Sequence, residues 1–151
     1  RNLRFAFLTS RKILAFALHR SFREAAAQVE RVKKFHRLKG KIVENEELEE
    51  KFRRKIERAL KGEKPNLELE KYRYPEVYRR LLQTEPGETI TYGKLARETG
   101  VHVRQVVWAL KFNPFPILIP CHRVVARNGI GGYTPLGTSF KVFLLEMEKD
   151  L

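Results

Sequence analysis

The sequence is almost free of sulfur and poor in histidine. It holds one cysteine, Cys121, one methionine and four histidines among 151 residues. A lone cysteine excludes an internal disulfide and any zinc site built from several cysteines. Because the four histidines are scattered along the chain, we expect no structural metal.

Long apolar runs are also missing. No stretch reaches the roughly 18 uninterrupted apolar residues of a membrane span. Residues 1–5 lack the apolar segment and cleavage site of a secretory signal. We therefore expect a cytoplasmic protein with no membrane partner. Hydrophobic residues still make up 42% of the chain, which is enough for a core in one domain or two small ones.

Acidic residues are too few to balance the basic ones. The net charge is +13 and the pI is about 10.1, so a polyanion is the expected partner. Nucleic acid is the first candidate and an anionic membrane surface the second. The excess is spread over both halves of the chain, so charge alone does not locate the binding face. A charged fraction of 32% with few Asn, Gln, Cys and Met is also typical of a thermophile.

The first third of the chain predicts a β-hairpin followed by a helix. Apolar runs at 3–8 and 13–18 are short enough to be two paired strands. Ser21 followed by Glu24 is a capping-box pattern, so a helix is expected from here to near Gly40. Its inner face would be formed by Phe22, Ala25, Ala26, Val29 and Val32.

A second helix and a connector complete the N-terminal part. A third short strand is expected at 41–43, and Asn45 can cap a helix that ends before Gly62. The polar stretch that follows resembles a connector in composition. We therefore divide the chain into a subdomain of residues 1–73, connector included, and a second subdomain of residues 74–151.

The second subdomain predicts several short helices. One follows Pro75, and Thr91 caps another from Tyr92 to about Glu98. After a turn at Gly100, a further helix would bury Val103, Val106, Val107 and Leu110. Two helices joined this way form either a DNA-binding helix-turn-helix or an ordinary helical hairpin. A final helix, capped by Thr138 or Ser139, would pack Phe140, Phe143, Leu144 and Met147 inward.

The only cysteine lies in an unusual apolar stretch, residues 113–125. Prolines at 114, 116 and 120 prevent a helix or central strand, so we expect an extended backbone that presents Cys121 at a turn. A thiol reacts as thiolate and needs a base or cationic neighbour at neutral pH. His122 can be that neighbour. The alternative is a buried cysteine that acts only as a small hydrophobic residue.

The run Asn-Pro-Phe-Pro-Ile-Leu-Ile-Pro-Cys-His-Arg-Val-Val at 113–125 closely resembles the active-site motif of O6-alkylguanine-DNA alkyltransferases. The resemblance extends more thinly from about Tyr74 to Leu151, and residues 1–73 match only in layout. It implies an α/β (α+β) fold with a small antiparallel sheet and helices first, then a helical winged helix-turn-helix subdomain that bears the active site.

The same resemblance implies DNA repair by direct reversal. An alkyl group on O6 of guanine in double-stranded DNA, or on O4 of thymine, would pass irreversibly to Cys121 without a cofactor, so each protein acts once. By resemblance, His122 is the base that reaches the thiol through a water, and Glu148 orients it. Tyr92 would donate a proton to the departing guanine. Asn113 would join the helical turn to the cysteine segment. Neighbouring Glu146 is the competing carboxylate for the role of Glu148.

The resemblance also implies DNA and flipped-base contacts. Arg104 would enter the base stack and replace the extruded nucleotide. The family usually has Arg-Ala-Val-Gly in this helix, whereas Gln105 and Val107 replace its alanine and glycine here, which puts the fit to the DNA groove in question. Further contacts are expected from small Ala109, the backbone of Val124, and the proline and loop residues Pro116, Tyr133 and Thr134.

Two other functions remain open at this point. A non-catalytic lesion-recognition or transcriptional DNA-binding protein of the same fold would not need Cys121. A cysteine hydrolase using Cys121 and His122 would need turnover and an oxyanion hole, which no motif marks. For each reading we expect a monomer.

Overall fold

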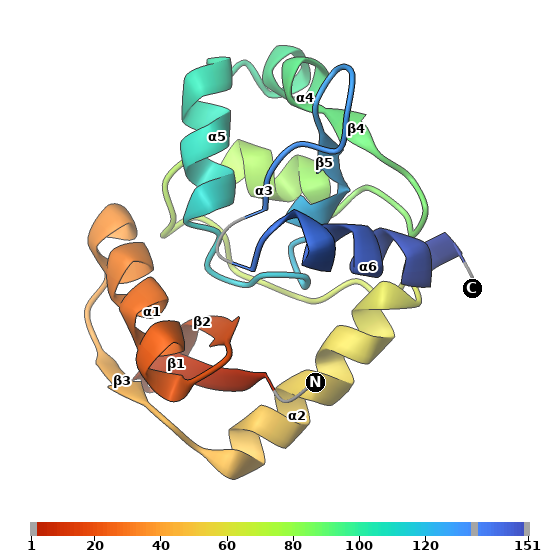
Figure 1. The fold of residues 1–151 in the computed structure, drawn as a ribbon. Coiled ribbons are helices and arrows are strands. Elements are labelled where there is room, and N and C mark those ends of the chain that lie inside the picture. Colours follow the sequence, from red (N-terminus) through yellow and green to blue (C-terminus); the bar gives the residue numbers. More distant parts are fainter. Residues whose placement is uncertain (1–2, 134–135, 150–151) are drawn as a thin grey trace.

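The computed structural model describes residues 3–133 and 136–149 (Figure 1). The N-terminal part contains β1 (Arg4–Ser10), β2 (Lys12–His19), α1 (Phe22–His36), β3 (Lys41–Val43) and α2 (Glu46–Leu60). The C-terminal part contains α3 (Pro75–Leu81), β4 (Ile90–Thr91), α4 (Tyr92–Thr99), α5 (Val103–Lys111), the 3-10 turn η1 (Cys121–Arg123), β5 (Val124–Val125) and α6 (Thr138–Lys149). This mixed α/β architecture confirms the expected fold class.

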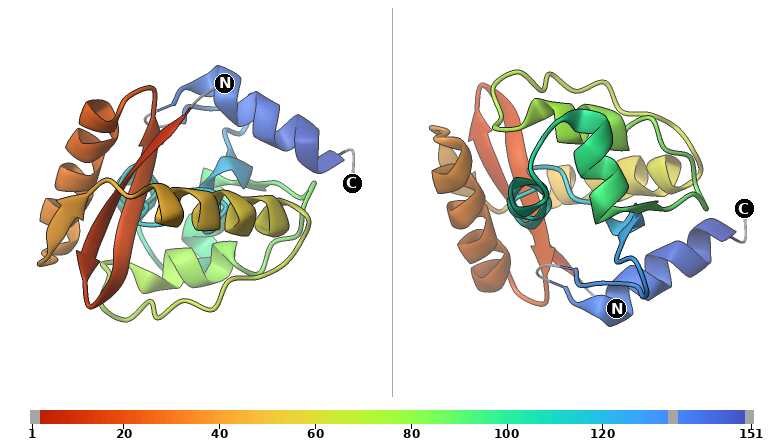
Figure 2. Two further views of the ribbon diagram at one scale, coloured as in Figure 1. Left: turned by 90° about the horizontal axis from the view of Figure 1, so that it is seen from below. Right: turned by 90° about the horizontal axis from the view of Figure 1, so that it is seen from above.

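The N-terminal sheet is antiparallel, with β1 between β2 and β3. Alternate residues of a strand point to opposite faces of the sheet, so each face packs against its own layer. Small residues such as Ala6 and Ala17 pack against α1. Phe7 and Phe16 point the other way and pack on Phe52 of α2, each with ring centroids 5.2 Å apart. Figure 2 shows α1 and α2 on opposite sides of the sheet.

The predicted start of α1 is confirmed, but its predicted end is wrong. The Ser21 side chain accepts the backbone N–H of Glu24 at 3.2 Å. The helix ends at His36 and not near Gly40, because Arg37 adopts a left-handed conformation with φ 56°. The N–H of Leu38 then bonds the carbonyl of Lys33 at 2.9 Å, which closes the helix.

Helices α4 and α5 are joined by the predicted turn and pack against each other (Figure 1). Thr91 caps α4, and Gly100 ends it in a left-handed conformation, as expected. The predicted inner face of α5 is partly wrong. Val106 is buried, but Val103 and Val107 are 42% and 47% exposed. The body of the protein covers only one narrow face of this short helix, so its other apolar residues remain on the surface.

The predicted cap and inner face of α6 are also partly wrong. The helix already includes Thr138, so neither Thr138 nor Ser139 is its cap. Phe143 and Met147 are 42% and 40% exposed. The buried positions are Lys141, Leu144, Leu145 and Glu148. Two of the four buried residues are charged, and that is why counting apolar residues gave the wrong phase.

The C-terminal part also contains a feature that the sequence pattern did not predict. Strands β4 and β5 form a parallel pair, with Ile90 opposite Val124 and Thr91 opposite Val125. This pair holds η1 close to the beginning of α4. None of the helices among residues 3–133 and 136–149 is long and apolar enough to cross a membrane.

The two parts share packing across the predicted boundary at residue 73. The N–H of Phe16 bonds the carbonyl of Pro114 at 2.9 Å, and Nε2 of Gln28 donates to the carbonyl of Lys111 at 3.1 Å. The sheet therefore buttresses the cysteine segment. The division into two subdomains stays a prediction.

Candidate active site

The cysteine segment turns where an extended backbone was expected. Ile117 has φ 72°, an unfavourable conformation for a β-branched residue, and the N–H of Ile119 bonds the carbonyl of Phe115 at 2.8 Å. Asn113 holds this turn on both sides. Its Oδ1 accepts the N–H of Phe115 and its Nδ2 donates to the carbonyl of Ile119, each at 2.9 Å. Cys121 follows as the first residue of η1, so the predicted turn at the cysteine is confirmed.

The Cys121 thiol is buried and surrounded by polar groups. Its residue is 6% exposed, and Nδ2 of Asn113 lies 3.1 Å from Sγ. Burial raises the pKa of the thiol, whereas the Asn113 hydrogen bond, the Tyr133 hydroxyl and the charge of Lys141 oppose that rise. Because the net pKa is raised, Cys121 is protonated at neutral pH in this structure and needs a base to react.

His122 has the arrangement of a base. Its ring is fully buried, and Nε2 lies 2.9 Å from Oε2 of Glu148. A carboxylate accepts only, so Nε2 carries the proton and Nδ1 is left as the acceptor. Nδ1 is buried and has no hydrogen-bond partner among the residues the structure describes. Burial lowers the pKa of His122, although Glu148 opposes that shift, so the ring is neutral and able to take a proton.

Arg123 holds the carboxylate of Glu148, an interaction that the sequence did not predict. Its Nη2 lies 2.7 Å from Oε2, and its Nη1 donates to both oxygens of Thr84 at 2.9 Å. Burial alone would raise the pKa of Glu148, but the hydrogen bonds from His122 and Arg123 outweigh it and lower the pKa to about 2. Glu148 is therefore a fixed anion, linked through Arg123 to the end of α3.

Tyr92, the first residue of α4, lies against a glycine-rich loop, described over residues 128–133. Burial and the neighbouring Cys121 raise the pKa of its hydroxyl. Gly131 has φ 80°, and a Cβ there would lie 3.0 Å from the Tyr92 hydroxyl oxygen. Only glycine fits this position without strain.

Lys141 closes the loop from the other side, and sequence reasoning missed it as well. Its Nζ donates to the carbonyls of Ile130 and Gly132 at 2.7 and 3.0 Å and lies 5.9 Å from the centre of the Tyr92 ring. Burial lowers the pKa of Lys141, while the nearby Cys121 opposes that shift.

A pocket of about 320 Å³ opens beside the thiol. That volume lies in the range of small-ligand sites, about 300–1,000 Å³. Its lining joins α4, α5, the cysteine turn and the loop, and consists of Tyr92, Val107, Leu110, Lys111, Cys121, Gly132 and Tyr133. The thiol of Cys121 and the phenol of Tyr92 thus line one space, and His122 follows directly after Cys121 in the chain.

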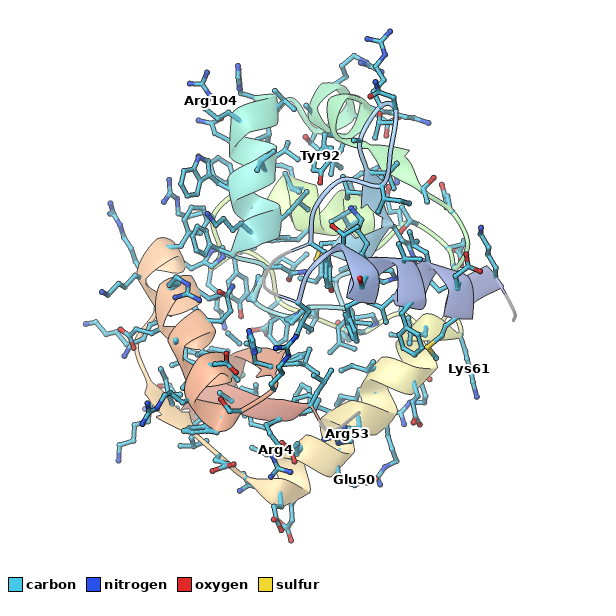
Figure 3. All side chains as sticks on the ribbon, in the orientation of Figure 1. Arg4, Glu50, Arg53, Lys61, Tyr92 and Arg104 are labelled. Atoms are coloured by element: carbon cyan, nitrogen blue, oxygen red, sulfur yellow. The ribbon has the colours of Figure 1, made fainter. Side chains whose placement is uncertain are left out.

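The other predicted contact residues lie at different depths. Arg104 and Gln105 are exposed at the N-terminal end of α5, where Arg104 points outward (Figure 3). Ala109 faces the interior, and its carbonyl accepts the Tyr78 hydroxyl at 2.8 Å, so its small side chain serves packing. Pro116 is half-buried, and Val124 is buried in β5. Thr134 lies outside the described residues.

Comparisons with known proteins agree with this geometry. The family model described as "6-O-methylguanine DNA methyltransferase, DNA binding domain" matches residues 73–150. A methylated-DNA–protein-cysteine methyltransferase of Methanocaldococcus jannaschii is 45% identical over 83 residues, which is 52% of this chain and 49% of the relative. The match thus spans about half the length of that relative.

Two solved structures resemble nearly the whole chain. The O6-methylguanine-DNA methyltransferase of the hyperthermophilic archaeon Pyrococcus kodakaraensis has a TM-score of 0.73 and 29% identity, over 96% of this chain and 92% of that one. An O6-methylguanine DNA methyltransferase of Methanococcus jannaschii has a TM-score of 0.57 and 26% identity, over 99% and 90%. Since the family model covers more than half of the sequence, and its range includes Cys121, His122 and Glu148, the chain belongs to the 6-O-methylguanine DNA methyltransferase family.

Proposed function

We propose that this protein repairs DNA by transferring the alkyl group of O6-alkylguanine to Cys121, once per molecule. The observation that carries the proposal is the hydrogen bond between Glu148 and His122, the residue that directly follows Cys121. Glu148 holds Nε2 of His122 at 2.9 Å, and Nδ1 of the same ring is left as an acceptor. A hydrolase would need an oxyanion hole as well. Here the pocket beside Cys121 instead offers Tyr92 as a proton donor.

The proposed reaction is a single displacement. His122 takes the thiol proton through a water, and Sγ of Cys121 attacks the alkyl carbon. The S–C bond forms as the C–O6 bond breaks, and the electron pair leaves with guanine. Tyr92 gives its proton to the guanine ring, so the base departs neutral. The thioether product is too stable to hydrolyse, and the protein is consumed.

Positively charged groups support DNA as the partner. The net charge of +13 favours phosphate contacts, and α5, which lines the Cys121 pocket through Val107 and Leu110, exposes Arg104 and Gln105 at its N-terminal end. We infer that α5 lies on the duplex and that Arg104 replaces the extruded nucleotide. A base turned out of the stack is needed because Cys121 is buried. Action on O4-alkylthymine, the monomeric state and the cytoplasmic location belong to the same proposal.

Intact mass tests the proposal directly. Wild-type protein incubated with excess duplex carrying O6-methylguanine should gain the mass of one methyl group and then stop reacting. Cys121→Ala should gain nothing while still binding the duplex. If wild type binds the duplex without any gain of mass, the non-catalytic lesion-recognition alternative replaces direct reversal.

A further inference from the structure

The flank of α5 that faces away from Cys121 carries a run of stacked aromatic rings. Trp108, the only tryptophan of the chain, is 43% exposed and stacks on Phe112 with centroids 5.7 Å apart and planes inclined by 10°. Phe112 stacks in turn on Phe35 of α1, at 4.8 Å and 25°. Positions 104, 108 and 112 recur every four residues, so they share one flank of the helix.

Cationic side chains lie over these rings. The guanidinium of Arg73 is 4.4 Å from the centre of the Phe35 ring and 5.5 Å from that of Tyr74. Nζ of Lys111 is 5.3 Å from the centre of the Trp108 ring. The flank therefore combines flat apolar faces with positive charge, and none of the described residues that line it is acidic.

A pocket of about 420 Å³ runs along this flank, again within the small-ligand range of about 300–1,000 Å³. It is lined by Phe35, Arg73, Tyr74, Arg104, Gln105 and Trp108. Arg104 therefore stands at the edge of this second pocket, and Val107 and Leu110 of the same helix line the pocket of Cys121. Helix α5 separates the two.

We propose that this flank is a second nucleobase site, in which an unpaired base of the DNA strand stacks on Trp108 and its phosphate meets the guanidinium of Arg73 in the lining of the same pocket. Aromatic faces combined with arginine are the means by which proteins hold single-stranded DNA without reading its sequence. An apolar peptide would gain nothing from Arg73 and Arg104, the two cations of the lining, whereas a polynucleotide supplies both the flat ring and the phosphate. The position of the DNA rests on the proposed function, which lays α5 on it.

Fluorescence of the single tryptophan tests the site without any lesion. Wild-type protein is titrated with a short oligothymidylate and with an abasic oligonucleotide of the same length, at one salt concentration. Stacking predicts quenching of Trp108 by the oligothymidylate only, and roughly tenfold tighter binding of it than of the abasic strand. Equal affinity for both strands with unchanged fluorescence would overturn the proposal and leave phosphate contacts alone.

Variants separate stacking from charge. Trp108→Leu and Arg73→Gln should each weaken binding of labelled oligothymidylate by roughly tenfold, measured by anisotropy. Lys61→Gln removes one positive charge from the far end of α2 (Figure 3) and should change affinity only slightly. Circular dichroism checks that each variant is folded. If Lys61→Gln weakens binding as much as Arg73→Gln, the effect is general charge and the site is excluded.

The outcome is independent of alkyl transfer. Quenching by undamaged oligothymidylate together with no methyl gain from damaged duplex would refute the proposed function but not this site. A normal methyl gain with no quenching would refute this site and keep the proposed function.

Discussion

The protein buries two histidines, and their surroundings differ in one respect that decides what each can do. His36, the last residue of α1, accepts the N–H of Arg73 at Nδ1, at 3.0 Å, and donates from Nε2 to the carbonyl of Phe112 at 2.8 Å. Both nitrogens are used by backbone groups. In His122 only Nε2 forms a hydrogen bond, to a carboxylate, and Nδ1 is left as an acceptor.

The groups around each ring set its affinity for a proton. Burial lowers the pKa of His36 to about 4, and the positive charge of Arg73 also disfavours protonation. His122 is just as buried, but Glu148 would stabilise the imidazolium that forms when the thiol loses its proton. A buried histidine is therefore evidence for catalysis only when one nitrogen is available and the other faces a fixed anion. The two sites can be compared experimentally within one protein.

The largest expected effect comes from replacing each ring with glutamine. His122→Gln can still donate to Glu148 but cannot take a proton, so methyl transfer should slow by about 100-fold or more. His36→Gln offers one donor and one acceptor to the same backbone groups, and its transfer rate should stay within about twofold of wild type. Single-turnover transfer rates with methylated duplex measure both.

The expected contrast would disappear if His36→Gln slowed transfer as strongly as His122→Gln. That result would mean that both histidines act on the reaction through the fold. Urea unfolding of the two variants shows whether loss of structure accounts for any slow rate.

The next effect concerns stability at mildly acidic pH. The pKa of His36 is about 4 in the folded protein and about 6.5 ordinarily, so the unfolded chain binds the proton first. Stability from this site is present above pH 6.5 and is lost as pH falls toward 4. Between pH 7 and 5 the loss from His36 should be about 2 kcal/mol.

Urea unfolding at pH 7 and pH 5 measures this loss, and His36→Gln should largely remove it. His122 shifts in the same direction and contributes the remainder. Glu148 does not interfere, because its pKa of about 2 places its own loss of stability below about pH 4.5. A wild-type curve that is flat between these pH values would show that His36 is not held neutral.

The candidate site residues that the sequence indicated are those whose contacts are local or belong to the motif. Cys121, His122 and Asn113 lie within one short run, and the prolines around them indicated a turn. Arg123 belongs to the same run but was missed, because its hydrogen bonds are to Thr84 and Glu148, which are distant in the sequence. No local pattern reports such a partner.

The same limit explains the errors in the helices. Lys141 was not predicted, because a lysine is buried only where other groups accept its hydrogen bonds. The carbonyls that do so belong to the loop and lie outside α6, so the helical pattern does not reveal them. The early end of α1 at His36 depends on Arg37, which is a left-handed residue other than glycine and gives no signal in the sequence. The strand pair β4–β5 is only two residues long on each side, too short for a periodic pattern.

The smallest expected effect comes from the hydrogen bond between Thr84 and Arg123, the arginine that holds Glu148 beside His122. Thr84 is buried, and its hydroxyl donates to the carbonyl of Leu81 at 2.6 Å and accepts Nη1 of Arg123 at 2.9 Å. Thr84→Val removes that acceptor but leaves the backbone carbonyl of Thr84, also 2.9 Å from Nη1. Arg123 keeps most of its contacts, so stability should fall by about 1 kcal/mol. Transfer should slow only a few-fold, because Glu148 still faces His122.

Thr99→Val is the matched control, since the Thr99 hydroxyl donates to the carbonyl of Leu95 at 2.7 Å within α4 and contacts neither Arg123, Glu148 nor His122. It should lose comparable stability and keep the wild-type transfer rate. If the rate falls equally in both variants, the hydrogen bond between Thr84 and Arg123 matters only for folding. Arg123 and Glu148 then position His122 without Thr84.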